Sequence, residues 1–234
     1  MDYRGGEMTV DLLQYSALNV CAHAIRTCWQ SFDKSDDGGE KDRELIDRVG
    51  NKFKHASTLE HLSYTFYISG VSRALLQELA RHRVASLSVK STRYTLKELK
   101  EEESFTLGMG MAELKEKYTN PDEVYSDKHM ARGSRYLVYT GNLGVDFSSL
   151  CALENLRIML QEGVSNDRAK YCLPESYKTE LTWSINARSL QNFIALRSGK
   201  SALWEIRDLA KAIFDALPED HKYLFSHCFG DHNG

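Results

Sequence analysis

The sequence predicts a helix-rich α/β chain of the α+β type, with a small sheet. Proline occurs only three times in 234 residues, which suits a chain built mainly of helices. Apolar residues recur at helical spacing in several segments and alternate with polar residues in two others. Because long helical stretches separate these strands without a regular βαβ rhythm, a doubly wound sheet is disfavoured. We expect one compact domain over 1–234, with 1–8 as a loose N-terminal extension.

The first third of the chain divides into helices, a loop and one clear strand. Residues 16–30 are expected to form a helix, and its buried face is predicted to comprise Ala17, Val20, Cys21, Ala24 and Cys28. SDDGG at 35–39 is typical of a loop, and 40–53 has helical character. Residues 62–70 alternate as a strand whose buried face is Leu62, Tyr64, Phe66 and Ile68.

The middle and C-terminal parts are mostly helical in pattern. A helix over 72–83 begins with a Ser N-cap and is followed by an extended segment, VASLSVKSTRY. Residues 97–145 are polar and give no assignment. The remaining expected elements are helices at 147–162, 166–174, 187–198 and 201–217, and a strand at 176–185. In the helix at 187–198, the predicted core residues are Leu190, Phe193, Ile194 and Leu196.

Charge and cysteine usage exclude several classes of protein. A net charge of −3 argues against a general nucleic-acid-binding surface. Five scattered cysteines without a C-x-x-C pair argue against a disulfide framework or a zinc site, and favour reduced thiols in the cytoplasm. No apolar run approaches the roughly 20 residues that span a bilayer, so no membrane contact is expected.

One basic stretch stands out against this acidic balance. RHRVASLSVKSTRY, residues 81–94, contains four Arg or Lys side chains, one His and four small hydroxyl residues before its final tyrosine. One interpretation is a solvated helix end, where cations complement the helix dipole. The other is a cradle for a small anion, because hydroxyl and backbone N–H groups around an arginine suit phosphate. In that cradle Ser91 is expected to donate to a phosphate or base rather than to act as a nucleophile.

Two further segments have polar residues at suggestive spacings. In HASTLEH, His55 and His61 are six apart and unsuited to one helical face, so a metal site is disfavoured and Ser57 belongs to a cap or turn. In INARSLQNFIALR, residues 185–197, Arg188 and Asn192 share a helix face, whereas the last arginine lies about 180° away from Arg188 around the axis. Either segment can be an ordinary polar surface or part of a ligand site.

These motifs together resemble those of the flavin-dependent thymidylate synthases. Arg81-His82-Arg83, seven residues and Ser91-x-Arg93 match that family's R-H-R-x7-S-x-R signature. AIRTCWQSF, HASTLEH and LPESYKTELTWSINARSLQNFIALR resemble three further blocks, and only the first few residues and about 100–145 are not covered. The resemblance implies a compact fold with a small, mainly antiparallel sheet, in a homotetramer with shared active sites. It also implies methylation of dUMP to dTMP, with tightly bound FAD, and with NADPH and 5,10-methylenetetrahydrofolate as co-substrates.

The resemblance implies a role for each matching residue. The flavin contacts would be Ser57, Arg81, His82, Arg83, Asn186, Arg188 and Asn192, with His82 supplying positive charge or a stacking surface. The dUMP contacts would be Gln77 or Glu78, Arg81, Val89, Ser91, Arg93, Lys170 and Arg197. Arg197, placed against the uracil ring, would also be catalytic, and no metal is implied.

The chain departs from the family's pattern at three places. Ser88 and Val89 stand where the family often has Asn and Glu or Gln, so a nucleotide contact at Val89 would use its backbone. Cys28 replaces a serine, which weakens a flavin contact there, and Lys200-Ser201 stand where a histidine is frequent. Two other classes remain as alternatives, a nucleotide hydrolase that binds phosphate with the basic cluster and a flavin- or nucleotide-binding module without turnover.

Overall fold

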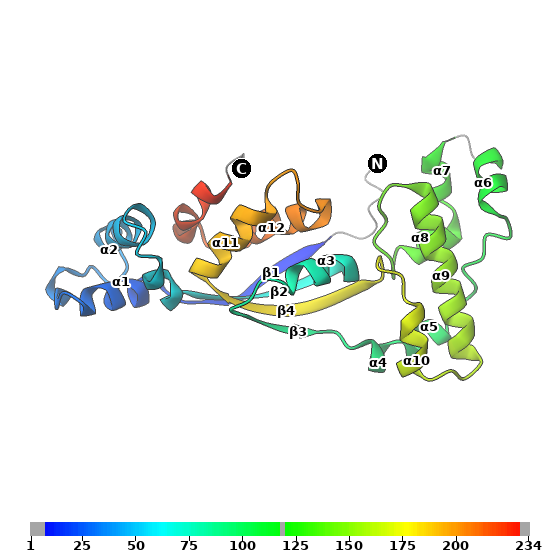
Figure 1. Cartoon of the computed structure of the whole chain (residues 1–234), viewed down its shortest axis with the longest axis horizontal. Coiled ribbons are helices and arrows are strands. Elements are labelled where there is room, and N and C mark those ends of the chain that lie inside the picture. The colour runs from blue at the N-terminus through cyan, green and yellow to red at the C-terminus, as the bar shows by residue number, and fades with distance from the viewer. Residues whose placement is uncertain (1–7, 118–119, 230–234) are drawn as a thin grey trace. The chain divides into compact units, whose positions relative to one another are not determined.

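The computed structural model describes residues 8–117 and 120–229 (Figure 1). Apart from Met8, the expected loose extension over 1–8 lies outside the described residues. Contacts group the chain into two compact units. The sheet unit comprises Thr9–Ser69, Gln77–Ser88 and Leu181–Gly234, and the α9 unit comprises Gly70–Leu76 and Val89–Glu180. A single domain over 1–234 stays a prediction.

A four-stranded sheet has the order β1-β2-β4-β3, and its strands are β1 (Thr9–Tyr15), β2 (Ser63–Ser72), β3 (Ala85–Val89) and β4 (Lys178–Asn186). β1 runs antiparallel to β2, with Thr9 opposite Ser69 and a register shift between Leu12 and Gln14. The predicted alternation in β2 is confirmed, because Tyr64, Phe66 and Ile68 are fully buried. A helix-rich chain with a small antiparallel sheet is therefore the fold that the sequence predicted.

Helices make up most of the remaining structure. The α-helices are α1 (Leu18–Thr27), α2 (Glu40–Ile46), α3 (Arg73–Leu79), α4 (Thr92–Thr95), α5 (Lys97–Lys100), α6 (Met111–Lys117), α7 (Pro121–Tyr125), α8 (Lys128–Gly133), α9 (Leu143–Gln161), α10 (Asn166–Ala169), α11 (Ala187–Arg197) and α12 (Trp204–Ala216). The 3₁₀ segments are η1 (Phe32–Lys34), η3 (Ala56–His61), η4 (Lys170–Cys172), η5 (Glu219–Leu224) and η6 (Ser226–Cys228), and η2 (Asp47–Lys52) is a π-helix.

The core of the sheet unit contains aromatic side chains from β2, β4 and α11. The Trp183 ring lies edge-on to Phe193 with the centroids 5.0 Å apart, and it also contacts Phe66. Leu190, Phe193 and Ile194 are buried as predicted, whereas Leu196 was wrongly placed in the core, because its side chain is 59% exposed. A ligand-facing surface can therefore lie on the side of α11 opposite the core.

The buried face of α1 differs from the predicted one. It consists of Leu18, Cys21, Ala22, Ile25 and Arg26, so that only Cys21 was predicted correctly. Arg26 is buried because its Nε and Nη2 atoms donate to Asp42 Oδ1 at 3.1 and 2.6 Å. The buried face of α1 therefore includes a charged residue, paired with Asp42, which a pattern of apolar residues does not predict.

The chain leaves α3 before the basic motif begins. α3 ends at Leu79, so the prediction of a helix to residue 83 was wrong, although Ser72 Oγ does accept a hydrogen bond from Leu75 N at 3.0 Å near its start. Residues 80 and 81 form a turn, and Val84, three residues further on, has a φ of 58°. Since a β-branched residue rarely adopts this left-handed conformation, the turn redirects the chain into β3 at a cost in strain. The segment after β3 begins a short helix, α4, rather than staying extended.

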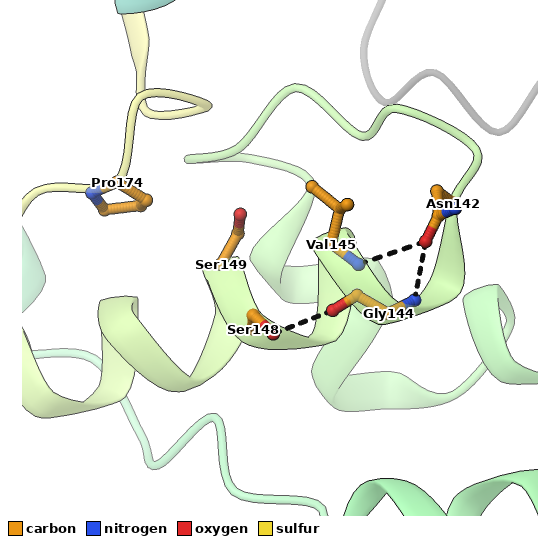
Figure 2. Close-up of a pocket in the computed structure, with 6 residues that line it drawn as sticks. All are labelled: Asn142, Gly144, Val145, Ser148, Ser149 and Pro174. Atoms are coloured by element: carbon orange, nitrogen blue, oxygen red, sulfur yellow. Dashed lines mark hydrogen bonds between the residues drawn. The ribbon is translucent and has the colours of Figure 1, made fainter.

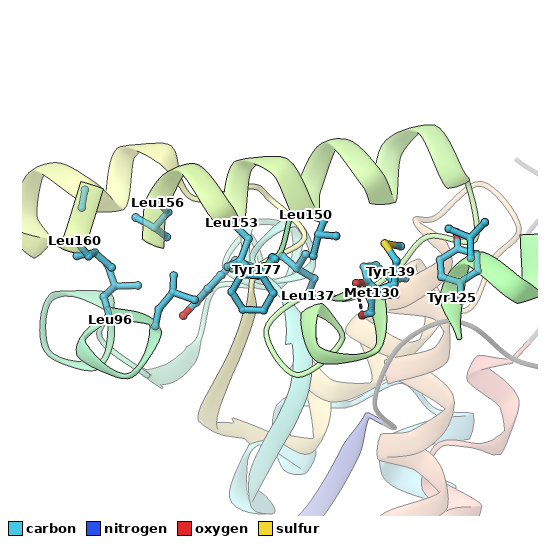
Figure 3. Close-up of a cluster of buried hydrophobic side chains, with 14 of the residues drawn as sticks. Leu96, Tyr125, Met130, Leu137, Tyr139, Leu150, Leu153, Leu156, Leu160 and Tyr177 are labelled. Atoms are coloured by element: carbon cyan, nitrogen blue, oxygen red, sulfur yellow. Dashed lines mark hydrogen bonds between the residues drawn. The ribbon is translucent and has the colours of Figure 1, made fainter. Parts of the chain in front are cut away.

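The α9 unit has its own core, centred on its longest helix (Figure 3). Leu150, Leu153, Leu156 and Leu160 point from one side of α9 and pack with the buried side chains Leu96, Met130, Leu137, Tyr139 and Tyr177. The polar segment 97–145 supplies much of this cluster through α5 to α8, which are each too short for a clear helical period. The fold of segment 97–145 therefore depends on its packing against α9.

Candidate active site

Arg197, at the end of α11, is the centre of a polar cluster in the sheet unit. Its Nε atom donates to His82 Nε2 at 2.8 Å, and its Nη1 atom donates to Glu78 Oε2 at 2.7 Å. Its Nη2 atom donates to the Glu78 main-chain oxygen at 3.2 Å. Only 16% of the Arg197 side chain is exposed. The structure thus brings together three residues that the sequence predicted for one site, although Arg197 lies more than 100 positions from the other two in the chain.

His82 is a neutral acceptor in this cluster. The ring is buried and lies edge-on to Phe193, with the centroids 5.0 Å apart. Burial, followed by the nearby charges of Arg197 and Arg81, lowers the pKa of His82 from 6.5 to about 4. Because Nε2 accepts the Arg197 hydrogen bond, the single ring proton of the neutral form is on Nδ1. With a pKa of about 4 and with Nε2 as an acceptor, the His82 ring is neutral near pH 7 in this cluster.

The remaining cations of the basic motif point outward from the same unit. Arg81 is 72% exposed in its side chain, and its Nη1 atom lies 3.6 Å from Glu78 Oε2, so one carboxylate is shared by two arginines. Arg83 is exposed, and so is Gln77 on α3. Exposed guanidinium groups with long, flexible stems are available to an anion without first breaking a strong contact.

The C-terminal block lies along α11, next to η3. Asn186 Oδ1 caps α11 by accepting from Ser189 N at 2.8 Å, so that its side-chain oxygen has a structural role. Arg188 and Asn192 are both exposed and four residues apart, and Arg188 Nη1 donates to Glu60 Oε1 at 2.7 Å. Ser57 is exposed on η3, which packs against α11. The predicted flavin contacts therefore occur on neighbouring elements of one unit.

The predicted phosphate ligands belong to the α9 unit. Arg93, on α4, forms a two-atom contact with Asp167, with Nε at 2.7 Å from Oδ1 and Nη2 at 3.5 Å from Oδ2. Asn166 Nδ2 donates to the Arg93 main-chain oxygen at 2.7 Å, which ties α4 to α10. Ser91 precedes α4, and Lys170 follows α10. Ser91 and Arg93, predicted for the phosphate, and Lys170, predicted near the nucleotide, thus lie on or next to two short helices in contact.

Sequence reasoning missed two acidic partners. Asp167 pairs with Arg93 across 74 positions, and Glu60 pairs with Arg188 across 128 positions. Glu60 lies inside a motif that was singled out, but nothing in a single sequence marks either carboxylate as the partner of a particular arginine. Val89, at the end of β3, has an exposed side chain, so a backbone contact there remains a prediction.

Some other places in the described structure have fewer side chains that could bind a charged ligand. A hollow at the start of α9 is lined by Asn142, Gly144, Val145, Ser148, Ser149 and Pro174 (Figure 2). Asn142 Oδ1 already accepts from Gly144 N and Val145 N, and no lining side chain is charged. Over the described ranges, no group of three or more His, Cys, Asp or Glu residues could hold a metal ion. Within the same ranges, no helix is both long and apolar enough to cross a bilayer.

The helix-rich α+β fold thus has two polar clusters, in each of which an arginine is paired with a carboxylate. A family model described as "Thymidylate synthase complementing protein" matches residues 11–221. The chain is 66% identical over 218 residues to the flavin-dependent thymidylate synthase of Wolinella succinogenes, covering 93% of this chain and 97% of the relative. It is 63% identical over 221 residues to that of Campylobacter jejuni strain RM1221, covering 94% and 97%.

A solved structure agrees with these relatives. The crystal structure of thymidylate synthase X from Helicobacter pylori with FAD and dUMP superposes with a TM-score of 0.84 at 55% identity. The match covers 94% of this chain and 98% of that one. The chain belongs to the flavin-dependent thymidylate synthase family. The resemblance seen in the sequence motifs is confirmed.

Proposed function

We propose that this chain converts dUMP to dTMP, with 5,10-methylenetetrahydrofolate as carbon donor and NADPH as reductant. Family membership and the relatives named flavin-dependent thymidylate synthase support the reaction class. The observation that best supports it in this chain is the partly buried Arg197, held by Glu78 and His82. A fixed guanidinium in a poorly solvated position suits a reaction in which a substrate ring develops negative charge.

The residues of the sheet unit fit FAD. A flat cofactor with an anionic pyrophosphate needs cations together with polar side chains for its ring edges. Arg81, Arg83 and Arg188 are exposed cations, and Asn192 and Ser57 are exposed polar groups on η3 and α11. When bound, FAD supplies the hydride, which it receives from NADPH. His82 contributes no positive charge to this set, so we assign it to Arg197 rather than to the pyrophosphate.

Ser91, Arg93 and Lys170 are proposed to hold the dUMP phosphate in the α9 unit. Asp167 keeps the Arg93 guanidinium oriented, but an exposed ion pair is worth only about 0–1 kcal/mol. A phosphate dianion can therefore replace the carboxylate or share the guanidinium with it at small cost. Arg93 would then make charge-assisted bonds that fix the nucleotide.

Arg197 is proposed to stabilise the anionic form of the uracil ring, in which C5 is nucleophilic enough to attack the one-carbon unit. Aimed donors of this kind contribute roughly 3–4 kcal/mol to the barrier. The two buried thiols are poor candidates for an alternative nucleophilic mechanism, because burial raises the pKa of Cys21 to about 12 and that of Cys228 to about 11. We expect Arg197→Lys to lower turnover more than dUMP binding, since an ammonium cannot serve both Glu78 and His82 in the same geometry. Equal turnover would remove Arg197 from the catalytic residues.

The decisive experiment measures tritium release from dUMP labelled at C5. We expect release that requires both methylenetetrahydrofolate and NADPH, because the methyl group replaces the C5 hydrogen. A hydrolase would instead release inorganic phosphate without either co-substrate, and a binding module would release neither product. Release of phosphate alone, or no product with FAD-loaded protein, would refute the proposal.

We extend the proposal to a cytoplasmic homotetramer with shared active sites. All five cysteines are unpaired in the structure, which agrees with a reducing compartment. Sedimentation equilibrium of the FAD-loaded protein is expected to give four times the chain mass. A monomer that turns over at the full rate would contradict shared sites.

A further inference from the structure

A small polar pocket lies in the α9 unit, and none of the residues that line it was predicted to bind FAD or dUMP. Its volume is about 160 Å³, and residues of α4, α5 and β4 line it together with residues that follow β3 and α8. This volume is below the range of about 300–1,000 Å³ that is usual for drug-sized ligands. One water takes up about 30 Å³ in the liquid, so the pocket has room for a small ion and a few waters.

The Lys178 ammonium, at the start of β4, lines this pocket without a counter-ion. Its Nζ atom donates to the main-chain oxygen of Ser134, and over the described ranges no carboxylate lies within ion-pair distance of it. The side chain is half-buried, and burial lowers the pKa of Lys178. An ammonium has three N–H donors, so two remain for a ligand. Because a charge removed from water without a partner is costly, a bound anion would offset a cost that the fold already carries.

Two more cations, Lys90 and Arg135, line the same pocket, and each of them is paired with a carboxylate. Lys90 Nζ lies 2.9 Å from Glu180 Oε1, and Arg135 Nη1 donates to Glu102 Oε1 at 3.0 Å. The side chains of Lys90 and Arg135 are 38% and 64% exposed, and ion pairs with so exposed a partner are weak. Their remaining N–H groups can therefore turn toward an anion. Arg135 favours an oxyanion, because its planar donors match two oxygen atoms at once.

One carboxylate opposes these three cations. Among the described residues that line the pocket, Glu98 alone is acidic, and it is exposed on α5. Burial, followed by the charge of Glu98, raises the pKa of Tyr177 to about 12, so the field of this carboxylate reaches a group that lines the pocket. Glu98 therefore repels an anion in the pocket, and replacing it by an uncharged residue should strengthen anion binding.

We propose that this pocket is a second anion site, which binds a small divalent oxyanion of the size of inorganic phosphate through Lys178, Lys90 and Arg135. A phosphate dianion has several acceptor oxygens, so it can accept from the ammonium of Lys178 and from the guanidinium of Arg135 at the same time. A chloride ion has no such set of acceptors and carries half the charge. The pocket should therefore prefer phosphate to chloride.

This site is distinct from the proposed ligands of the dUMP phosphate. Lys90 N donates to the Glu180 main-chain oxygen at 2.9 Å, so the chain still runs along β4 at this residue. Ser91 follows directly and also has extended backbone angles. Because successive side chains of an extended chain point to opposite sides, Lys90 and Ser91 face different ligands. An anion in the pocket and the phosphate of dUMP can then be bound together.

The test is a calorimetric titration of the FAD-loaded protein with inorganic phosphate, at an ionic strength held constant with sodium chloride. We expect saturable binding that persists with saturating dUMP and in Arg93→Ala. Lys178→Gln should weaken phosphate binding roughly tenfold or more, because hydrogen bonds from a charged group are lost. Glu98→Gln should tighten it by up to about fivefold, because an exposed like charge is removed. The matched control Lys97→Gln, which changes an exposed lysine next to Glu98, should have the affinity of wild type.

Several outcomes would overturn the proposal. Equal affinity of wild type and Lys178→Gln, with normal urea unfolding of both, would exclude the pocket. Should Lys178→Gln fail to fold, the exposed Arg135→Gln replaces it in the same comparison. Phosphate binding that is lost with dUMP or in Arg93→Ala would place the anion at the nucleotide site instead, and chloride that binds as tightly as phosphate would exclude an oxyanion site. Weaker binding in Glu98→Gln would contradict the charge argument. The measurement needs no turnover, so these results are separate from the tritium assay.

Discussion

The hydrogen bond from Arg197 Nε to His82 Nε2, 2.8 Å long, gives the sharpest test of the proposed catalytic cluster. Two substitutions of His82 test the contribution of its aromatic ring and that of its hydrogen-bond acceptor separately. His82→Phe keeps an aromatic ring against Phe193 but removes the acceptor. His82→Gln gives up the ring but places a side-chain oxygen within similar reach. If His82 acts by positioning Arg197, the glutamine variant should be the more active of the two.

The size of the effect follows from the contacts. Arg197 is mostly buried, so losing an acceptor leaves a charged N–H group without a partner. A hydrogen bond to a charged group contributes about 1.5–3 kcal/mol. Applied to the barrier, this free energy corresponds to roughly a tenfold to hundredfold loss of turnover. We expect this loss for His82→Phe, a loss of no more than about threefold for His82→Gln, and smaller changes in the KM for dUMP.

Three measurements check this prediction. Tritium release gives kcat and KM for both variants, and urea unfolding shows whether they fold normally. Nitrogen NMR of the wild-type protein at pH 7 should show His82 protonated on Nδ1 and not on Nε2. Equal turnover of the two variants at normal stability would refute the positioning role. A proton on Nε2 would refute the hydrogen-bond assignment itself.

Three further predictions concern pH, the second core and the phosphate ligands. The pKa of His82 is lowered from 6.5 to about 4, so the unfolded chain binds one more proton between these values, and the free energy of unfolding should fall by up to about 3 kcal/mol as pH drops through that window. Urea unfolding should show this component in wild type but not in His82→Gln. Hydrogen bonds from Arg157, the main-chain N–H of residue 105 and the hydroxyl of residue 104 lower the pKa of Glu154 from 4.5 to about 2, so its contribution is present above pH 4.5 and is lost toward pH 2. Glu154→Gln leaves Arg157 without its counter-ion and should cost about 3–5 kcal/mol at pH 7 in the same assay; a cost under 1 kcal/mol would contradict a buried pair. Arg93→Ala should raise the dUMP concentration needed for half-saturation and flatten its salt dependence, whereas Asp167→Asn should leave saturation equal or improved; an unchanged titration for the alanine variant would exclude Arg93 as a phosphate ligand.

Periodic segments were predictable because one face of each is buried. β2 and α11 have apolar residues at the strand and helix periods, and the structure buries Tyr64, Phe66 and Phe193 accordingly. β1 was not predicted, because it is largely exposed and lacks a clean alternation. The α1 face was predicted wrongly because Arg26 is buried by a partner 16 positions away. When a residue is buried because it pairs with a charge elsewhere in the chain, the residues around it in the sequence do not reveal its burial.

The residues of the candidate site were predictable as a set, but their contacts were not. The motifs supplied Glu78, His82 and Arg197, and the structure adds that Arg197 donates hydrogen bonds to the other two. A single sequence has no signal for the pairing of Arg93 with Asp167, which depends on how α4 and α10 pack. Nor could it give the protonation of His82, since the pKa depends on burial and on the Arg197 and Arg81 charges.

Arg93 and Arg197 are both paired with a carboxylate, but they differ in how easily a ligand can displace that carboxylate. The Arg93–Asp167 pair is more than half exposed, so a doubly charged phosphate can displace the carboxylate at little cost. Arg197 is held by three hydrogen bonds in a mostly buried position, which makes displacement of Glu78 unfavourable. A guanidinium has five N–H groups, so two remain for a ligand while the other three keep their partners. If Arg197 binds the uracil ring as proposed, the ring would lie beside the intact cluster, with the donors already aimed, and Glu78 would remain as an acceptor for a ring N–H.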